Sequence, residues 1–169
     1  LTDVDTADGN ITIATGGNTV ITDVATGSAG NDVAITASSG DVTIAAASAH
    51  DEMTLTASAG SINEIGAGDA GVDLSATTLT LNAQDEIGGA GELDLETTVT
   101  NLAAHSTNAG NIVVSETDGV TLTDVDTANG TITILADGTV IATDVVAGGA
   151  NNDVNITTST GDITHNVIT

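Results

Sequence analysis

The sequence predicts an all-β protein folded as a parallel β-solenoid. Three observations support this prediction: short strand-like segments follow glycine-containing turns along the whole chain, these segments recur at nearly constant spacing, and a long stretch returns at a fixed offset. The 169 residues include no aromatic residue, no proline and no cysteine. Aromatic side chains normally supply much of a globular core, so we expect a narrow interior of stacked Val, Ile and Leu.

The local pattern is a glycine, one or two polar residues, and then apolar residues in alternation. It occurs, for example, as GNITI at 9–13, GDVTI at 40–44 and GTITI at 130–134. Alternation over four or five mostly β-branched residues beside Gly, Asn or Asp is typical of a short strand after a tight turn. No segment carries an apolar stripe with helical periodicity. We therefore expect strands and turns and no helix.

The spacing of these segments predicts how the strands stack. One series has steps of 19–22 residues, and a second series, which includes Ile62, Leu79 and Val99, falls between its members. This predicts a right-handed β-helix of about eight coils of 19–22 residues, in which each strand pairs in parallel with its equivalent in the next coil. The expected inward column starts at Ile11, Val33, Met53, Val72, Leu93, Ile112, Ile132 and Val154.

A higher repeat spans several coils. Residues 1–43 and 122–164 align without a gap at an offset of 121 and match at 26 of 43 positions. We interpret 1–169 as a single continuous solenoid segment, with 1–121 as one full repeat of six coils and 122–169 as the start of the next. A β-sandwich also has short strands, but it does not explain a constant step held across eight coils.

The charge of the chain excludes several classes of function. It has 24 acidic residues, no Lys or Arg, and a net charge of −24. Nucleic acid binding is not expected, because phosphate contacts need Lys or Arg. No apolar run is long enough for a membrane span. Disorder is a competing interpretation of so acidic a chain, but the apolar fraction of 40% is strongly patterned.

Two segments resemble a known family. GDVTIAAAS at 40–48 and LTLNAQDEIGGAG at 79–91 are similar to the repeat regions of large secreted bacterial exoproteins of the filamentous haemagglutinin type. The resemblance implies a right-handed parallel β-helix displayed outside the cell, at the cell surface, as a shaft or an adhesive filament. The chain departs from it in its higher repeat of 121 residues and in its lack of basic residues.

The best candidates for a metal site are aspartates of a recurring Thr-Asp-Val motif. At a step of one coil, Asp3 is expected to lie over Asp23, and Asp124 over Asp144. Neighbouring strands are about 4.8 Å apart, and like charges at that distance repel. A bound cation would relieve the repulsion, and calcium is the cation that carboxylate oxygens suit best; solvation or proton uptake would also relieve it. No other cofactor is expected.

The three histidines, His50, His105 and His165, are predicted to be solvent-facing turn residues. They lie 55 and 60 residues apart, and no spacing typical of a zinc site is present. Catalysis is not expected either, because a unique active site should interrupt the repeat, whereas many of the acids recur with it.

The leading functional hypothesis is a structural one: a repeat segment of an extracellular filament or large surface adhesin, serving as an elongated acidic shaft. Its partners would be further copies of itself, joined in tandem or stacked end to end, with an axial repeat near 29 Å for six coils at about 4.8 Å each. The alternative is a solenoid module that binds glycan or calcium. A carbohydrate-active enzyme with a unique carboxylate pair is a remote third hypothesis.

Overall fold

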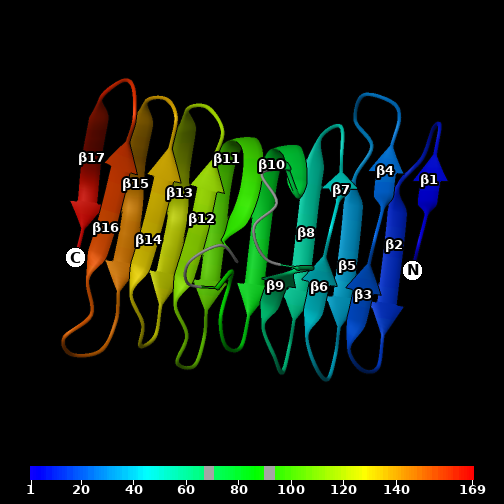
Figure 1. The fold of residues 1–169 in the computed structure, drawn as a ribbon, viewed down its shortest axis with the longest axis horizontal. Helices are drawn as coiled ribbons and strands as arrows, with labels where there is room; N and C mark the ends of the chain where they lie inside the picture. Colours follow the sequence, from blue (N-terminus) through cyan, green and yellow to red (C-terminus); the bar gives the residue numbers. More distant parts are fainter. Residues whose placement is uncertain (67–70, 90–93) are drawn as a thin grey trace.

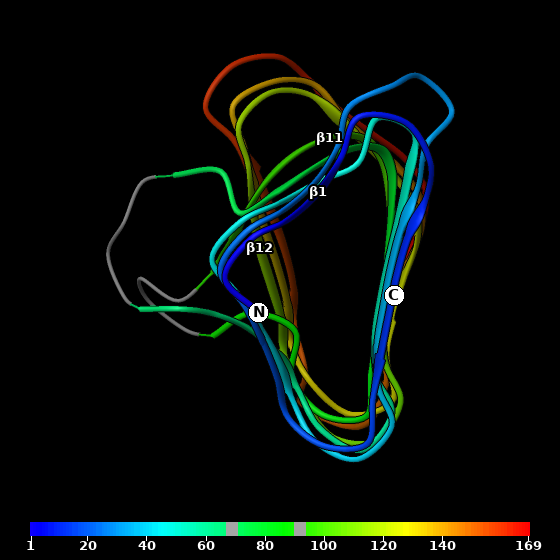
Figure 2. The same ribbon diagram turned by 90° about the vertical axis from the view of Figure 1, so that its right-hand side faces the viewer.

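The computed structural model describes residues 1–66, 71–89 and 94–169. It confirms the predicted class: an all-β protein whose parallel strands stack as a β-solenoid of about seven turns. The N-terminus lies at one end of the stack and the C-terminus at the other (Figure 1). Viewed end-on, successive turns superimpose around a narrow interior (Figure 2).

Most strands are short because a turn follows within a few residues, whereas β10 and β11, of 10 and 12 residues, each extend over two faces. In the described residues the strands are β1 (Val4–Thr6), β2 (Ile11–Thr15), β3 (Thr19–Ile21), β4 (Val24–Thr26), β5 (Val33–Ala37), β6 (Val42–Ile44), β7 (Ala47–Ser48), β8 (Glu52–Ala57), β9 (Ile62–Glu64), β10 (Leu74–Ala83), β11 (Leu95–Ser106), β12 (Ile112–Glu116), β13 (Val120–Thr127), β14 (Ile132–Ala136), β15 (Val140–Ala147), β16 (Val154–Thr158) and β17 (Ile163–Ile168).

The strands form three faces. The β2 face contains β2, β5, β8, the second half of β10, the second half of β11, β13, β15 and β17. The β1 face contains β1, β4, β7 and the first parts of β10 and β11. The β3 face contains β3, β6 and β9, continues through bridges at Ile87, and ends with β12, β14 and β16. β12 also pairs with the start of β11, so the β1 and β3 faces merge there.

The interior consists of aliphatic columns, as the alternation predicts. On the β2 face, Ile35, Leu55 and Leu81 occupy equivalent positions in successive turns, and all three are fully buried. Along each strand the neighbouring residues point outward, which gives β5 and β12 strictly alternating burial. Each turn thus buries its apolar side chains against the turns on either side of it.

The spacing prediction was wrong in detail. The partners of Ile11 in successive turns are Val33, Met53, Leu79, Leu102 and Leu122, so these turns take 22, 20, 26, 23 and 20 residues. Leu79 therefore follows Met53, whereas Val72 is 42% exposed. Leu93, the next predicted member of the column, lies outside the described residues. The two longest of these turns contain segments 66–73 and 88–94, which the constant step of about 20 residues did not anticipate.

The higher repeat consequently does not correspond to six turns. Five turns separate Ile11 from Leu122 on the β2 face. Ile132, the repeat equivalent of Ile11, lies half a turn further on, in β14 of the β3 face. The 121-residue repeat therefore spans about five and a half turns, and equivalent residues of its two copies lie on different faces.

Glycines stand where neighbouring turns approach too closely for a side chain. A Cβ added to Gly130 would lie 2.1 Å from the Gly110 carbonyl oxygen, and one added to Gly110 would lie 2.4 Å from the Asp85 carbonyl carbon. By contrast, a Cβ on Gly16 would meet nothing within 4 Å. Only glycine allows the backbone of one turn to lie this close to the next.

Across residues 1–66, 71–89 and 94–169, the structure has no helix with the length and apolarity that crossing a membrane requires.

Candidate functional site

The Thr-Asp-Val motif places its aspartates on the surface. Leu122 and Val125 are both buried, while Thr123 and Asp124 between them are both exposed. Two consecutive outward residues break the alternation, and the pairing of β13 with β11 shows the matching irregularity, a β-bulge. The bulge turns Asp124, which would otherwise face the core, toward solvent.

The four predicted metal ligands lie in two pairs of neighbouring turns. Val4 pairs with Val24, so Asp3 and Asp23 occupy equivalent positions, and the Val4 backbone N–H donates to the Asp23 carbonyl oxygen at 3.1 Å. Leu122 pairs with Ala142 and Val125 with Val145, which places Asp124 and Asp144 at equivalent positions as well. All four aspartates are exposed. Their occupation by calcium remains a prediction.

One of these aspartates belongs to a cluster with a histidine. The ligand atoms of His105, Asp124 and Asp126 all lie within 4.8 Å of one another. His105 lies within strand β11, not on a turn as predicted, and its Nδ1 is 2.6 Å from Asp126 Oδ1. Their side chains are 26% and 51% exposed. The cluster combines imidazole nitrogen and carboxylate oxygen in one place that solvent reaches.

A second cluster contains only carboxylates and is largely buried. Carboxylate oxygens of Glu64, Asp73 and Glu96 lie within 4.8 Å of one another. Asp73 is 1% exposed, and its Oδ2 accepts a hydrogen bond of 3.0 Å from the Glu96 backbone N–H. Burial, together with the negative charges of Glu96 and Glu64, raises the pKa of Asp73 to about 8. Asp73 is therefore largely protonated at neutral pH.

Glu116, which is not part of this cluster, is another acid whose side chain points inward. It is 2% exposed and accepts hydrogen bonds from the Thr97 hydroxyl at 2.7 Å and from the Val99 backbone N–H at 3.2 Å. Burial raises the pKa of Glu116 to about 7, and the charge of Asp118 acts in the same direction, although these hydrogen bonds oppose the rise. Glu116 thereby joins β12 to the adjacent turn from inside the solenoid.

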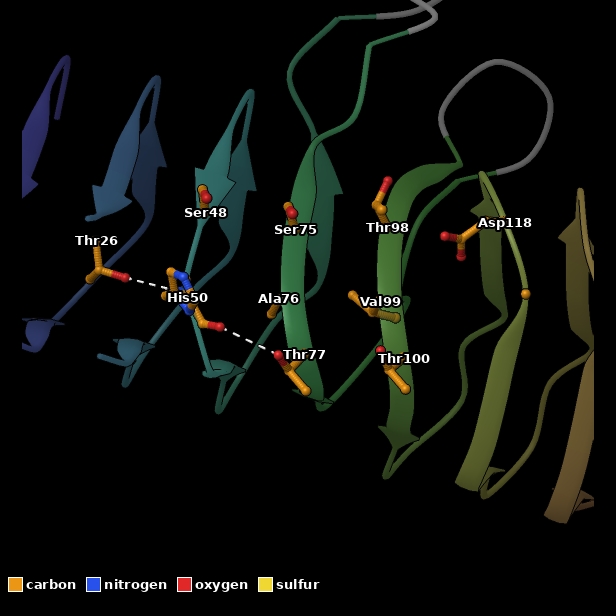
Figure 3. Close-up of a pocket in the computed structure, with 12 residues that line it drawn as sticks. Thr26, Ser48, His50, Ser75, Ala76, Thr77, Thr98, Val99, Thr100 and Asp118 are labelled. Carbon is orange, nitrogen blue, oxygen red and sulfur yellow. Dashed lines mark hydrogen bonds between the residues drawn. The ribbon is translucent and has the colours of Figure 1, made fainter. Parts of the chain in front are cut away.

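A groove lies at the corner between the β1 and β2 faces. It has a volume of about 420 Å³, and half of its lining residues are serine or threonine, with His50 and Asp118 among the others. Ser48, Ser75 and Thr98 occupy equivalent positions in three successive turns and form a ladder along it (Figure 3). The ladder repeats at the strand spacing of about 4.8 Å.

Hydrogen bonds between turns connect residues that line the groove. The His50 backbone N–H donates to the Thr26 hydroxyl at 3.1 Å, and the Thr77 hydroxyl donates to the His50 carbonyl oxygen at 3.3 Å (Figure 3). The imidazole of His50 takes part in neither bond. The imidazole is left as a further polar group among the lining residues.

The fold defines the class of this chain: it is a repeat protein built as a parallel β-solenoid. Comparisons with protein-family models, with curated proteins and with solved structures each found no match.

Sequence reasoning missed the inward acids, although a signal for them was present. In the strand beginning at Ile62, Glu64 is the second inward position, and in the strand beginning at Ile112, Glu116 is the third. Strict alternation therefore places both glutamates inside. The approach of His105 to Asp126 also had a signal, because a separation of 21 residues is about one turn, but it was missed because the histidines were assigned to turns.

Proposed function

We propose that this chain is a structural repeat segment of an extracellular filament or large surface adhesin, in which it serves as an elongated acidic shaft. The supporting observation is that two aliphatic columns of the β2 face, one containing Ile11 and the other Ile35, continue from β2 to β15, each turn pairing with the turns before and after it. Such a fold grows by adding turns, because no contact connects distant turns. The net charge of −24 keeps neighbouring shafts apart in solution.

Because each repeat spans about five and a half turns, the extra half-turn determines which face of a tandem array carries a given residue in successive repeats. Five and a half turns at about 4.8 Å each add about 26 Å per 121-residue repeat, compared with 29 Å for the six coils expected from the sequence. Equivalent residues of successive repeats then alternate between opposite faces. The same residue returns to the same face after two repeats, about 53 Å further along the axis.

Tandem chains with one, two and three 121-residue repeats test this proposal. Small-angle X-ray scattering is expected to give rods of constant cross-section whose length grows by about 26 Å per repeat. Electron micrographs of long arrays carrying a bulky tag on one residue per repeat are expected to show the tag on alternating sides. A compact particle, or a length that does not grow with repeat number, would contradict the shaft.

A second function, binding of a neutral glycan, is favoured by the hydroxyl-lined groove. Serine and threonine hydroxyls donate and accept hydrogen bonds, as sugar hydroxyls require, and the charge of the chain repels acidic sugars. Calorimetric titration with neutral oligosaccharides is expected to detect binding that Ser75→Leu abolishes. Thr54→Leu, on an outward position of the β2 face, is the matched control and should leave it intact. Equal binding by both variants would exclude the groove as the site.

A further inference from the structure

We propose that His105, Asp124 and Asp126 form a binding site for a divalent transition-metal ion such as Zn²⁺. The three side chains come from two neighbouring turns, His105 from β11 and the two aspartates from β13. Their ligand atoms already lie within 4.8 Å of one another. A zinc ion with ligand distances near 2.0–2.2 Å needs donor atoms no farther apart than about 4 Å, so only small side-chain rotations are required.

The backbone explains why these three residues converge. His105 pairs directly with Asp126 across the parallel ladder, and Ala103 pairs with Asp124. The bulge at Leu122–Asp124 turns Asp124 outward, and Val125 then returns to the interior, so Asp124 and Asp126 both face solvent on the same side as His105. Without the extra residue of the bulge, Asp124 would point into the core.

The donor set selects the type of metal. Imidazole nitrogen with two carboxylates is a zinc-type set of three protein ligands, which leaves a coordination position open to solvent. Calcium takes six to eight oxygen ligands, and the imidazole supplies none. The chain has no Lys or Arg, so neither of these side chains competes for the two carboxylates. This changes the expectation for Asp124, because His105 makes its surroundings suited to zinc and not to calcium.

The position of the site gives it a structural role. His105 belongs to the 1–121 repeat, whereas Asp124 and Asp126 belong to the copy that begins at residue 122. A metal bound there would join one repeat to the next at their junction. The same hexapeptide, LTDVDT, occurs at residues 1–6, and neither Asp3 nor Asp5 belongs to a three-donor cluster in the part of the chain that the structure describes. The copy at residues 1–6 therefore serves as an internal control for metal binding by the copy at residues 122–127.

The test uses the 169-residue chain, freed of metal by a chelator and then titrated with ZnCl₂ by calorimetry and with CoCl₂ by visible absorption. We expect one equivalent of Zn²⁺ to bind, to raise the melting temperature, and to perturb the NMR signals of one imidazole, that of His105. His105→Ala and Asp126→Asn should each weaken binding by roughly tenfold or more, since even outer-shell changes cost that much. Circular dichroism without metal verifies that each variant is folded.

The controls are Asp3→Asn combined with Asp5→Asn, and His50→Ala in the groove; both should bind Zn²⁺ as the unmodified chain does. The proposal is overturned if His105→Ala binds Zn²⁺ unchanged, if the Asp3 and Asp5 substitutions weaken binding equally, or if no imidazole signal responds. Calcium binding with the affinity of zinc would also overturn it. These outcomes are independent of rod length, so the experiments on zinc binding and on the elongated shaft test the two proposals separately.

Discussion

Leu55→Ala is expected to lower the free energy of unfolding by about 2–5 kcal/mol. Leu55 is fully buried in β8, stacked between Ile35 of the preceding turn and Leu81 of the following one. Truncation removes its contacts with both neighbours and leaves a cavity in a fully buried column. Thermal or urea unfolding followed by far-ultraviolet circular dichroism measures the loss of stability.

Leu135→Ala is the matched control for this substitution. Leu135 lies in β14 but points outward and is 45% exposed, so its truncation should change stability by no more than about 0.5 kcal/mol. Combining Leu55→Ala with Ile35→Ala should give a non-additive effect, because the two side chains touch across neighbouring turns. Equal losses for Leu55→Ala and Leu135→Ala would contradict the assignment of the interior column.

Lowering the pH from about 8 to about 5 is expected to stabilise the fold, although most proteins gain little there. Asp73 has its pKa raised from 3.8 to about 8, and Glu116 from 4.5 to about 7. At a pH between the ordinary pKa and the raised pKa of each group, the carboxyl is protonated in the folded chain and ionised in the unfolded chain. The stability that these groups contribute is therefore fully present below pH 3.8–4.5 and is lost as the pH rises toward 7–8.

Asp73→Asn is expected to remove much of this pH dependence and to stabilise the fold at pH 8.5, because the amide stays neutral where the carboxyl would have to ionise. Asp162→Asn, an exposed acid near β17, is the control and should keep the full slope. Thermal unfolding should be measured at high salt, because salt screens the repulsion among surface acids. Stability that rises between pH 5 and pH 8, or equal slopes for the two variants, would show that Asp73 is not the proton-holding group.

Much of the fold was predictable from the sequence. The alternation in segments such as 11–15 and 132–136 identified strands, and all of their neighbours in the structure are parallel, as the near-constant spacing required. The step from Asp3 to Asp23 and from Asp124 to Asp144 was also right, because each pair is separated by a turn of ordinary length. These features depend on local pattern and short spacing, which sequence carries directly.

The candidate sites were less predictable. His105 and Asp126 are 21 residues apart, which is one turn of ordinary length, but the pairing was missed because the histidines were assigned to turns. The groove was harder to predict, because it depends on the alignment of Ser48, Ser75 and Thr98, which are separated by unequal turns. A pattern with a constant step assigns such residues to the wrong face.

The sequence by itself determined that this chain stacks parallel strands around a thin aliphatic interior, because its period-two alternation and lack of aromatic residues permit little else. Only the tertiary structure decided which strand follows which. Each turn contains two similar strand-forming segments, and backbone hydrogen bonds alone do not select which of them pairs with a given strand of the preceding turn. The choice therefore rests on how the side chains of complete columns pack and on the lengths of two irregular turns, and it sets the repeat at five and a half turns instead of six.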